Sequence, residues 1–313
     1  MLEAQLARGD DYFTARAIFG RRLGLLYWLD KNWLEKHADT IFDLHTIEHE
    51  PSKAYGWAAW NTFLFSNNPH VEFYRILKKQ FSYAVDQAVH VDATESRREN
   101  PFARLGEHLI VLYGRGNLGR DARDAWNADD GIIKRLATQS HDSVRSHAIE
   151  FVGRTLPDDG DDVPEDAIDR FKYLWEQYWE AIGQEDAKRN PNSYVFGRWF
   201  SCGVFDSVWS IEQLGEFVEA APRANPDHMI MERLASICEV DPLRSARIVG
   251  MMVEGDVEGW RVGGWKGEAK TILSVAMKAG GGARDEAESV IDRLGRRGLL
   301  EFGELLDKRS DEG

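Results

Sequence analysis

Four side chains in the middle of the chain are of the types that bind a divalent metal. They are His108, the dipeptide His141-Asp142, and Asp169. Imidazole nitrogens and carboxylate oxygens are the usual ligands of metal ions that activate water for hydrolysis. A site of this kind requires helices or strands that bring the four side chains together from distant parts of the chain.

The order of these residues resembles that of the HD-type phosphohydrolases, which are helical metal enzymes. The resemblance implies a metal held by His108, His141, Asp142 and Asp169. A structural interpretation is favoured over it, because Asp142 lies where a helix begins and can accept a hydrogen bond from the first turn. The sequence offers no serine in a G-x-S-x-G context, and Cys202 has no nearby histidine. We therefore expect no enzyme activity and no cofactor.

Helices are the elements that the sequence predicts. Apolar residues recur with the helical period along most of the chain, strand signals are nearly absent, and Pro and Gly punctuate the connections. The clearest helix follows Pro164, where apolar residues recur at spacings of three and four. The fold class is therefore all-α. The other expected helices cover residues 12–29, 52–65, 70–89, 101–113, 142–156, 211–220, 227–238, 242–253, 267–278 and 283–294.

One acidic interval interrupts this pattern. Residues 157–164 contain four aspartates and a glycine, a charge density that cannot be buried. We therefore expect an N-terminal helical layer over residues 1–156, an acidic loop over 157–164, and a C-terminal helical layer with Trp-rich loops over 165–313. The two layers could also form one continuous solenoid.

Short phrases recur along the chain. The segment DSVRSHAIEFVG, from Asp142 to Gly153, resembles the second half of a HEAT repeat, and related phrases begin at Asp241 and Ala283. In HEAT-like proteins each helix pair buries its apolar face against the next pair. The resemblance implies an α-solenoid of stacked antiparallel helix pairs.

A second resemblance covers residues 192–306. Its phrases are FGRWF at 196–200, GVFDSVW at 203–209, GDVEGW at 255–260, and LLEFGELL at 299–306. They resemble the C-terminal helical tail of large bacterial proteins whose N-terminal part is a STAND-type ATPase or a Sir2-like effector, often in antiphage defence. The sequence lacks the phosphate-binding loops of those N-terminal parts. The resemblance therefore implies a sensor or scaffold that binds an ATPase or effector encoded nearby.

Four of the 11 tryptophans lie in Gly-rich connections, and Arg198, Arg261 and Lys266 flank three of them. An exposed aromatic side chain beside a cation is a common anchor at protein interfaces, so this set is the candidate protein-binding surface. The alternative, favoured by the large area that an aromatic ring buries, is that these side chains pack under the next helix pair. The candidate set comprises Arg198, Trp199, Trp209, Trp260, Arg261, Trp265 and Lys266.

Charge and cysteine content limit the partners and the compartment. The net charge of −14 disfavours nucleic acid, which leaves a HEAT-like nucleic-acid-binding protein as the weakest alternative. Cys202 and Cys238 cannot form a disulfide framework, which suits a reducing compartment. The apolar run over residues 23–29 is too short to span a bilayer. We therefore expect an acidic cytoplasmic protein whose partner is another protein and not a membrane.

Overall fold

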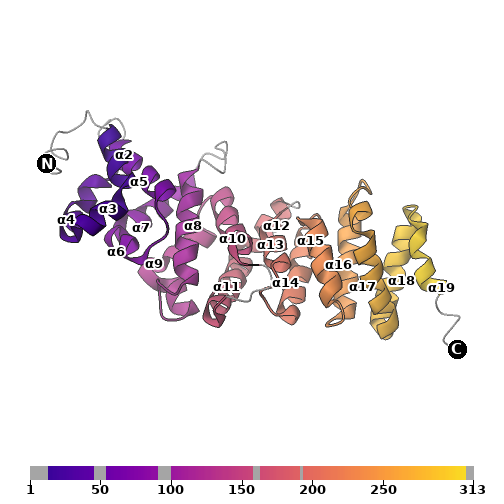
Figure 1. Ribbon diagram of the computed structural model, residues 1–313. Coiled ribbons are helices and arrows are strands. Elements are labelled where there is room, and N and C mark those ends of the chain that lie inside the picture. Colours follow the sequence, from indigo (N-terminus) through magenta and orange to yellow (C-terminus); the bar gives the residue numbers. More distant parts are fainter. Residues whose placement is uncertain (1–12, 46–53, 91–99, 158–162, 191–192, 308–313) are drawn as a thin grey trace. The chain divides into compact units, whose positions relative to one another are not determined.

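The computed structural model describes residues 13–45, 54–90, 100–157, 163–190 and 193–307 (Figure 1). Within these ranges every regular element is a helix, so the all-α class predicted from the sequence is confirmed. No described helix is both long enough and apolar enough to cross a membrane.

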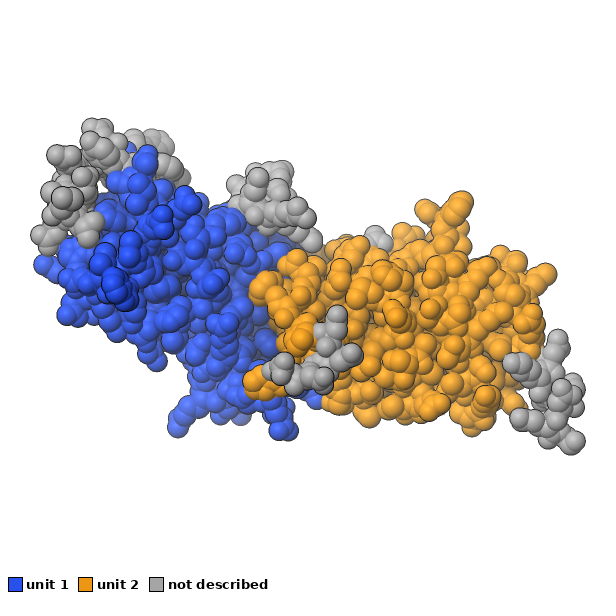
Figure 2. Space-filling view, in the orientation of Figure 1, with its two compact units in different colours: residues 1–149, 165–178 blue, residues 150–164, 179–313 orange. Residues whose placement is uncertain are grey.

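The chain forms two compact units. Unit 1 contains residues 1–149 and 165–178, and unit 2 contains residues 150–164 and 179–313 (Figure 2). The helix over residues 165–178, which the sequence assigned to the C-terminal layer, thus groups with unit 1 because it packs on two helices of that unit. Most of the expected acidic loop, residues 158–162, lies outside the described residues.

The helices of unit 1 pack around an aromatic core. Trp60 lies with its ring centroid 4.9 Å from that of Phe81, and Phe63 lies 6.0 Å from Phe81. Helices α2 and α5 lie in direct backbone contact, because a Cβ atom added to Gly20 would come within 1.9 Å of the carbonyl oxygen of Ala59. The helices are α2 (Phe13–Arg21), α3 (Leu23–Leu29), α4 (Lys31–Ile41), α5 (Ala54–Ser66), α6 (Val71–Ile76), α7 (Lys78–Gln87), α8 (Pro101–Gly114), α9 (Ala122–Thr138), α10 (Asp142–Thr155, of which residues 142–149 belong to unit 1) and α11 (Glu165–Tyr178).

Helix α11 is the helix that the sequence predicts after Pro164. Its apolar stripe, which includes Phe171, Leu174 and Trp175, is buried against α8 and α9. The hydroxyl group of Tyr113 on α8 donates a hydrogen bond of 2.9 Å to the carbonyl oxygen of Arg170. The apolar stripe predicted from the sequence is therefore the side of α11 that packs on α8 and α9.

Unit 2 consists of two rows of helices (Figure 1). Every second helix packs on the next one of its own row, so the chain alternates between the rows. One row contains α12 (Gln184–Arg189), α14 (Ser207–Ala220), α16 (Pro242–Gly255) and α18 (Gly281–Arg296), and the other contains α13 (Val195–Ser201), α15 (Asp227–Ile237), α17 (Lys266–Ala279) and α19 (Glu304–Asp307).

Helices α14 and α16 repeat one sequence pattern in register. Asp206 and Asp241 both cap their helix, each accepting a hydrogen bond of 2.9 Å from the backbone N–H three residues later. A glycine follows each capping aspartate after nine residues, Gly215 in α14 and Gly250 in α16. The segments 206–219 and 241–254 are therefore equivalent parts of one row.

Candidate functional site

The seven candidate binding residues are distributed over unit 2 in different environments. Trp199 and Trp265 are buried, Trp209 is half-buried, and Trp260 is 81% exposed. The four tryptophans therefore do not form one exposed surface. The sequence left open whether these tryptophans are buried or exposed, and the structure shows that some of them are buried and one is exposed.

Trp199 and Trp209 belong to the interface between α13 and α14. The ring of Trp199 stacks on that of Phe205, with centroids 5.4 Å apart and planes 14° apart. Trp209 contacts the same ring at a centroid distance of 5.1 Å. The neighbouring Arg198 reaches the sulfur atom of Met229 at 3.5 Å. These side chains pack between helices of unit 2, Trp199 fully buried and Arg198 and Trp209 half-buried.

Trp260 lies in the connection between α16 and α17, residues 256–265, which we call the Trp260 loop. Its organising side chain is Asp256, which is buried. The carboxylate of Asp256 accepts hydrogen bonds from the backbone N–H groups of Gly259 at 3.1 Å, Arg261 at 2.9 Å and Val262 at 3.0 Å. A buried carboxylate with three donors is fully solvated by the protein, so it fixes the backbone on both sides of Trp260.

Arg261 holds the Trp260 loop against the preceding connection. Its Nε donates to Oδ2 of Asp227 at 2.9 Å, and its Nη2 donates to the carbonyl oxygen of Ala224 at 2.9 Å and to Oδ1 of Asn225 at 3.0 Å. The indole N–H of Trp265 reaches the same Asp227 oxygen at 3.3 Å. Arg261 and Trp265 thus position the loop from within.

At the start of α17, Lys266 forms an ion pair of 2.7 Å with Glu301. This pair joins the helix that follows the Trp260 loop to the short 3₁₀ helix Leu300–Phe302. Among the seven candidates, Trp260 is therefore the member that presents a large apolar side chain to solvent.

A small hollow of about 250 Å³ lies beside Trp260. The second exposed apolar side chain of the loop, Val257, is 74% exposed and also lines this hollow. The loop therefore combines two exposed apolar side chains with a concave polar wall. The lining residues are Arg223, Asn225, Gly255, Asp256, Val257, Glu258, Trp260 and Arg261.

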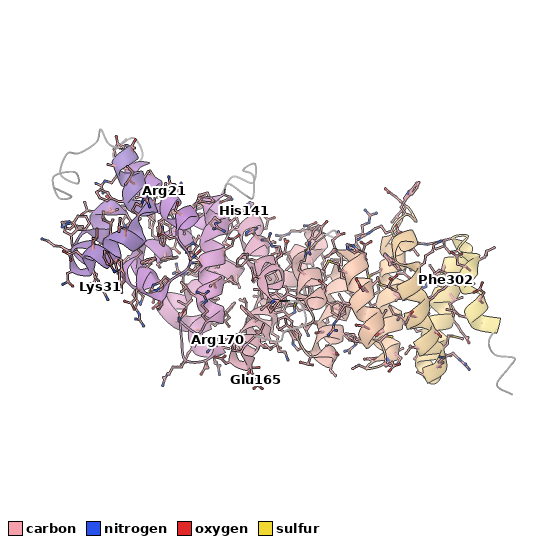
Figure 3. The ribbon with its side chains drawn as sticks, in the orientation of Figure 1. Arg21, Lys31, His141, Glu165, Arg170 and Phe302 are labelled. Carbon is pink, nitrogen blue, oxygen red and sulfur yellow. The ribbon has the colours of Figure 1, made fainter. Side chains whose placement is uncertain are left out.

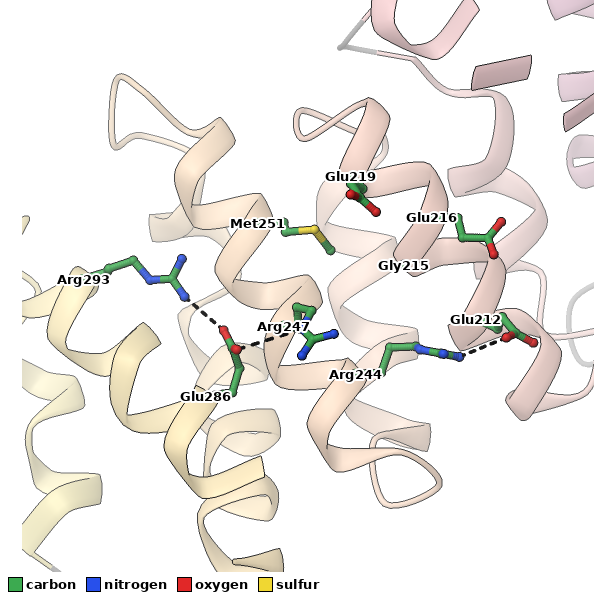
Figure 4. A pocket seen from close by; sticks show the side chains of 9 residues that line it. All are labelled: Glu212, Gly215, Glu216, Glu219, Arg244, Arg247, Met251, Glu286 and Arg293. Carbon is green, nitrogen blue, oxygen red and sulfur yellow. Dashed lines mark hydrogen bonds and ion pairs between the residues drawn. The ribbon is translucent and has the colours of Figure 1, made fainter. Parts of the chain in front are cut away.

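A larger hollow of about 400 Å³ crosses α14, α16 and α18 (Figure 4). Each of its three arginines has a carboxylate partner: Arg244 lies 3.5 Å from Glu212, Arg247 lies 4.0 Å from Glu286, and Arg293 lies 3.2 Å from Glu286. These carboxylates neutralise the arginines in place. The hollow is therefore a charged groove without a free cation among its lining residues.

Of the four residues of the metal-site alternative, His141 and Asp142 contact one another, with Nδ1 of His141 2.9 Å from Oδ1 of Asp142, whereas His108 and Asp169 lie in different environments. The ring of His108 is buried, and its Nε2 lies 3.0 Å from the carbonyl oxygen of Leu64, which can only accept. Burial lowers the pKa of His108 to about 4. The side chain of Asp169 is exposed, and across the described ranges His, Cys, Asp and Glu form no group of three or more that could hold a metal ion.

The hydrogen bond expected at Asp142 is present, because its Oδ1 accepts the backbone N–H of Ser143, in the first turn of the helix, at 2.7 Å. Helix α10 begins at Asp142, and the carbonyl oxygen of the preceding His141 accepts the first helical hydrogen bonds, from Val144 at 3.0 Å and from Arg145 at 3.1 Å. The Nδ1 atom of His141 lies 2.9 Å from the hydroxyl oxygen of Ser143. His141 therefore occupies the cap position, and Asp142 is the first residue of the helix.

Sequence reasoning missed Asp256 and Asp227, which fix the Trp260 loop. Asp256 stands in the quoted phrase GDVEGW, where an aspartate followed after three residues by glycine is typical of a loop closed by side-chain-to-backbone hydrogen bonds. No comparable signal marks Asp227, because its partners Arg261 and Trp265 lie far along the chain.

Comparisons of the chain with protein-family models, with curated proteins and with solved structures find no match. The HEAT-like and defence-tail resemblances therefore rest on the phrases quoted for them. The class that fold and site define is an all-α protein with an exposed tryptophan on a hydrogen-bonded loop.

Proposed function

We propose that the protein is a non-enzymatic interaction module whose Trp260 loop contacts another protein. The observation that carries this proposal is that Trp260 is 81% exposed although its loop is fixed by Asp256 and Arg261. A large exposed apolar side chain has a solvation cost that a partner relieves. A loop that is already ordered loses little conformational entropy on binding, so it binds more tightly than a flexible one.

We further propose that unit 2 is an α-solenoid of HEAT-like helix pairs. The alternation of helices between two rows and the equivalence of segments 206–219 and 241–254 support this architecture. In a solenoid, connections at one edge recur at regular intervals and serve as binding positions. The Trp260 loop is one such connection.

The role of such a module is that of a scaffold or a sensor. The resemblance of residues 192–306 to defence-protein tails makes an ATPase or effector encoded nearby the first partner to test. A cytoplasmic location suits Cys202 and Cys238, which are buried and form no disulfide. The protein would then contribute recognition, and its partner the catalytic step, in a bacterial defence assembly.

The test measures binding of a purified candidate partner by isothermal titration calorimetry. Truncation of a central aromatic anchor costs at least about 2 kcal/mol, so we expect Trp260→Ala to weaken binding about thirtyfold or more. The melting temperature should stay unchanged because the side chain is exposed.

Two valine variants provide a matched comparison. Val257→Ser, in the loop, should also weaken binding, whereas Val208→Ser, at an exposed position in the first turn of α14, should not. Equal affinity of the wild type and Trp260→Ala would place the interface elsewhere. A metal-dependent phosphatase activity of the purified chain would contradict the non-enzymatic assignment.

A further inference from the structure

Unit 1 carries an exposed apolar surface on α3 and the end of α2. Leu25, Trp28 and Leu29 lie at i, i+3 and i+4 on one side of α3, and α2, the preceding helix, exposes Ile18. All four are at least half exposed, and Trp28 is 79% exposed. We call these four residues the α3 face.

The opposite side of α3 is buried through Leu23 and Leu26, so the helix is anchored in unit 1 with the α3 face turned outward. The largest exposed apolar patch of a monomer is often a functional surface, which makes the α3 face a candidate interaction site.

Unpaired charges of opposite sign bracket α3. Arg21 and Arg22 precede the helix and are exposed, and Asp30 follows it and is exposed. None of the three forms an ion pair with another described residue. The next residue, Lys31, is already paired with Glu72 at 3.0 Å (Figure 3, which labels Arg21 and Lys31). The sequence from 13 to 29 contains no acidic residue.

A surface that is basic at one end, apolar in the middle and acidic at the other is complementary to itself after a two-fold rotation. If two copies of α3 pack antiparallel through the α3 face, with position 26 of one copy level with position 26 of the other, Arg22 lies opposite Asp30 of the partner subunit. We propose that the α3 face is the interface of a symmetric homodimer.

The charge pattern favours a second copy over a lipid surface. An anionic bilayer would attract Arg21 and Arg22 but would repel Asp30. In the antiparallel dimer both ends of α3 find an opposite charge.

The area of the α3 face sets the strength of the dimer. Four side chains that are at least half exposed, one of them a tryptophan, offer on the order of 500 Å² of apolar surface. Stable interfaces bury about 800 Å² on each partner. The dimer is therefore weak, with a dissociation constant in the micromolar range.

Analytical ultracentrifugation of the full chain between 1 and 500 µM, concentrations chosen to bracket that range, tests the proposal. We expect the weight-average mass to rise from 35.7 kDa toward twice that value. Trp28→Ala should weaken the dimer about thirtyfold or more. Trp260→Ala is the matched control, since it removes an equally exposed tryptophan from unit 2, and it should leave dimerisation unchanged.

A charge exchange tests the antiparallel arrangement. Arg22→Glu and Asp30→Arg should each weaken the dimer, because each places like charges opposite one another twice. The double variant should restore it. Asp30 also accepts the N–H of Trp33 at the start of α4, so circular dichroism checks that each variant remains folded.

Three results would overturn the inference. The first is a wild type that stays at 35.7 kDa at 500 µM, and the second is a Trp28→Ala variant that dimerises like the wild type. The third is a monomeric wild type that pellets with phosphatidylserine vesicles while Trp28→Ala does not, which would assign the α3 face to a lipid surface. None of these results bears on the Trp260 loop, whose partner binding is measured separately.

Discussion

The Trp260 loop should lose its fixed shape when the carboxylate of Asp256 is removed. In Asp256→Ala the N–H groups of Arg261 and Val262 lose their acceptor, whereas the N–H of Gly259 keeps the carbonyl oxygen of residue 256 at 3.1 Å. A donor left without a partner costs about 1–3 kcal/mol, so two cost about 2–6 kcal/mol. Asp256→Asn retains one side-chain oxygen and should cost about 1 kcal/mol.

Hydrogen exchange measured by mass spectrometry over residues 256–265 reports this change directly. A loss of about 2 kcal/mol raises the exchange rate about thirtyfold, provided that exchange occurs by local opening of the loop. Asp241→Ala is the control: it removes the cap of α16 and should accelerate exchange in the first turn of that helix but not in the loop. If Asp256→Ala left exchange of the loop amides within threefold of the wild type, the loop would be held by something other than this carboxylate.

Two further predictions concern unit 1. The pKa of buried His108 is lowered from 6.5 to about 4. Between these two pH values His108 is protonated in the unfolded chain but not in the folded chain, so the free energy of unfolding falls as the pH drops from 6.5 toward 4. Because of His108, the free energy of unfolding measured by urea titration should fall by about 2 kcal/mol between pH 7.5 and pH 5. In His108→Leu this part of the pH dependence should be absent. Asp130 has a φ of 58° and an exposed side chain, so Asp130→Gly should raise the free energy of unfolding by about 0.5–1 kcal/mol. A lower urea midpoint for Asp130→Gly would contradict the assigned strain.

The amphipathic helices could be predicted from the sequence, and their breaks could not. Residues 12–29 have a continuous helical pattern, yet the helix ends at Arg21 because Arg22 has a φ of −105° and a ψ of 21°. Helix α9 was missed because its first half is polar and because Asp129 and Asp130 leave the helical conformation within it. These departures depend on contacts with other helices, which local periodicity does not contain.

The candidate site was predicted in part for the same reason. Trp260 and Trp265 both stand in a Gly-rich connection with a basic neighbour, so their sequence contexts are nearly the same. What separates them is Asp227 on another helix, which accepts the indole N–H of Trp265. The burial of one and the exposure of the other are consequences of tertiary structure. The connection that carries Trp260 and Trp265 could thus be predicted from the sequence, but not which of the two side chains is exposed.

The equivalence of segments 206–219 and 241–254 has a consequence for how this chain can change. In the HEAT-like architecture proposed for unit 2, a helix pair is a repeat unit, because α14 and α16 share their capping aspartate and the glycine nine residues later. Duplication or deletion of one helix pair would bring together helix faces that already pack on one another in the present structure. No new core packing would therefore be needed. The length of unit 2 would then change by whole helix pairs, and each added or removed pair would add or remove its connecting loops as well.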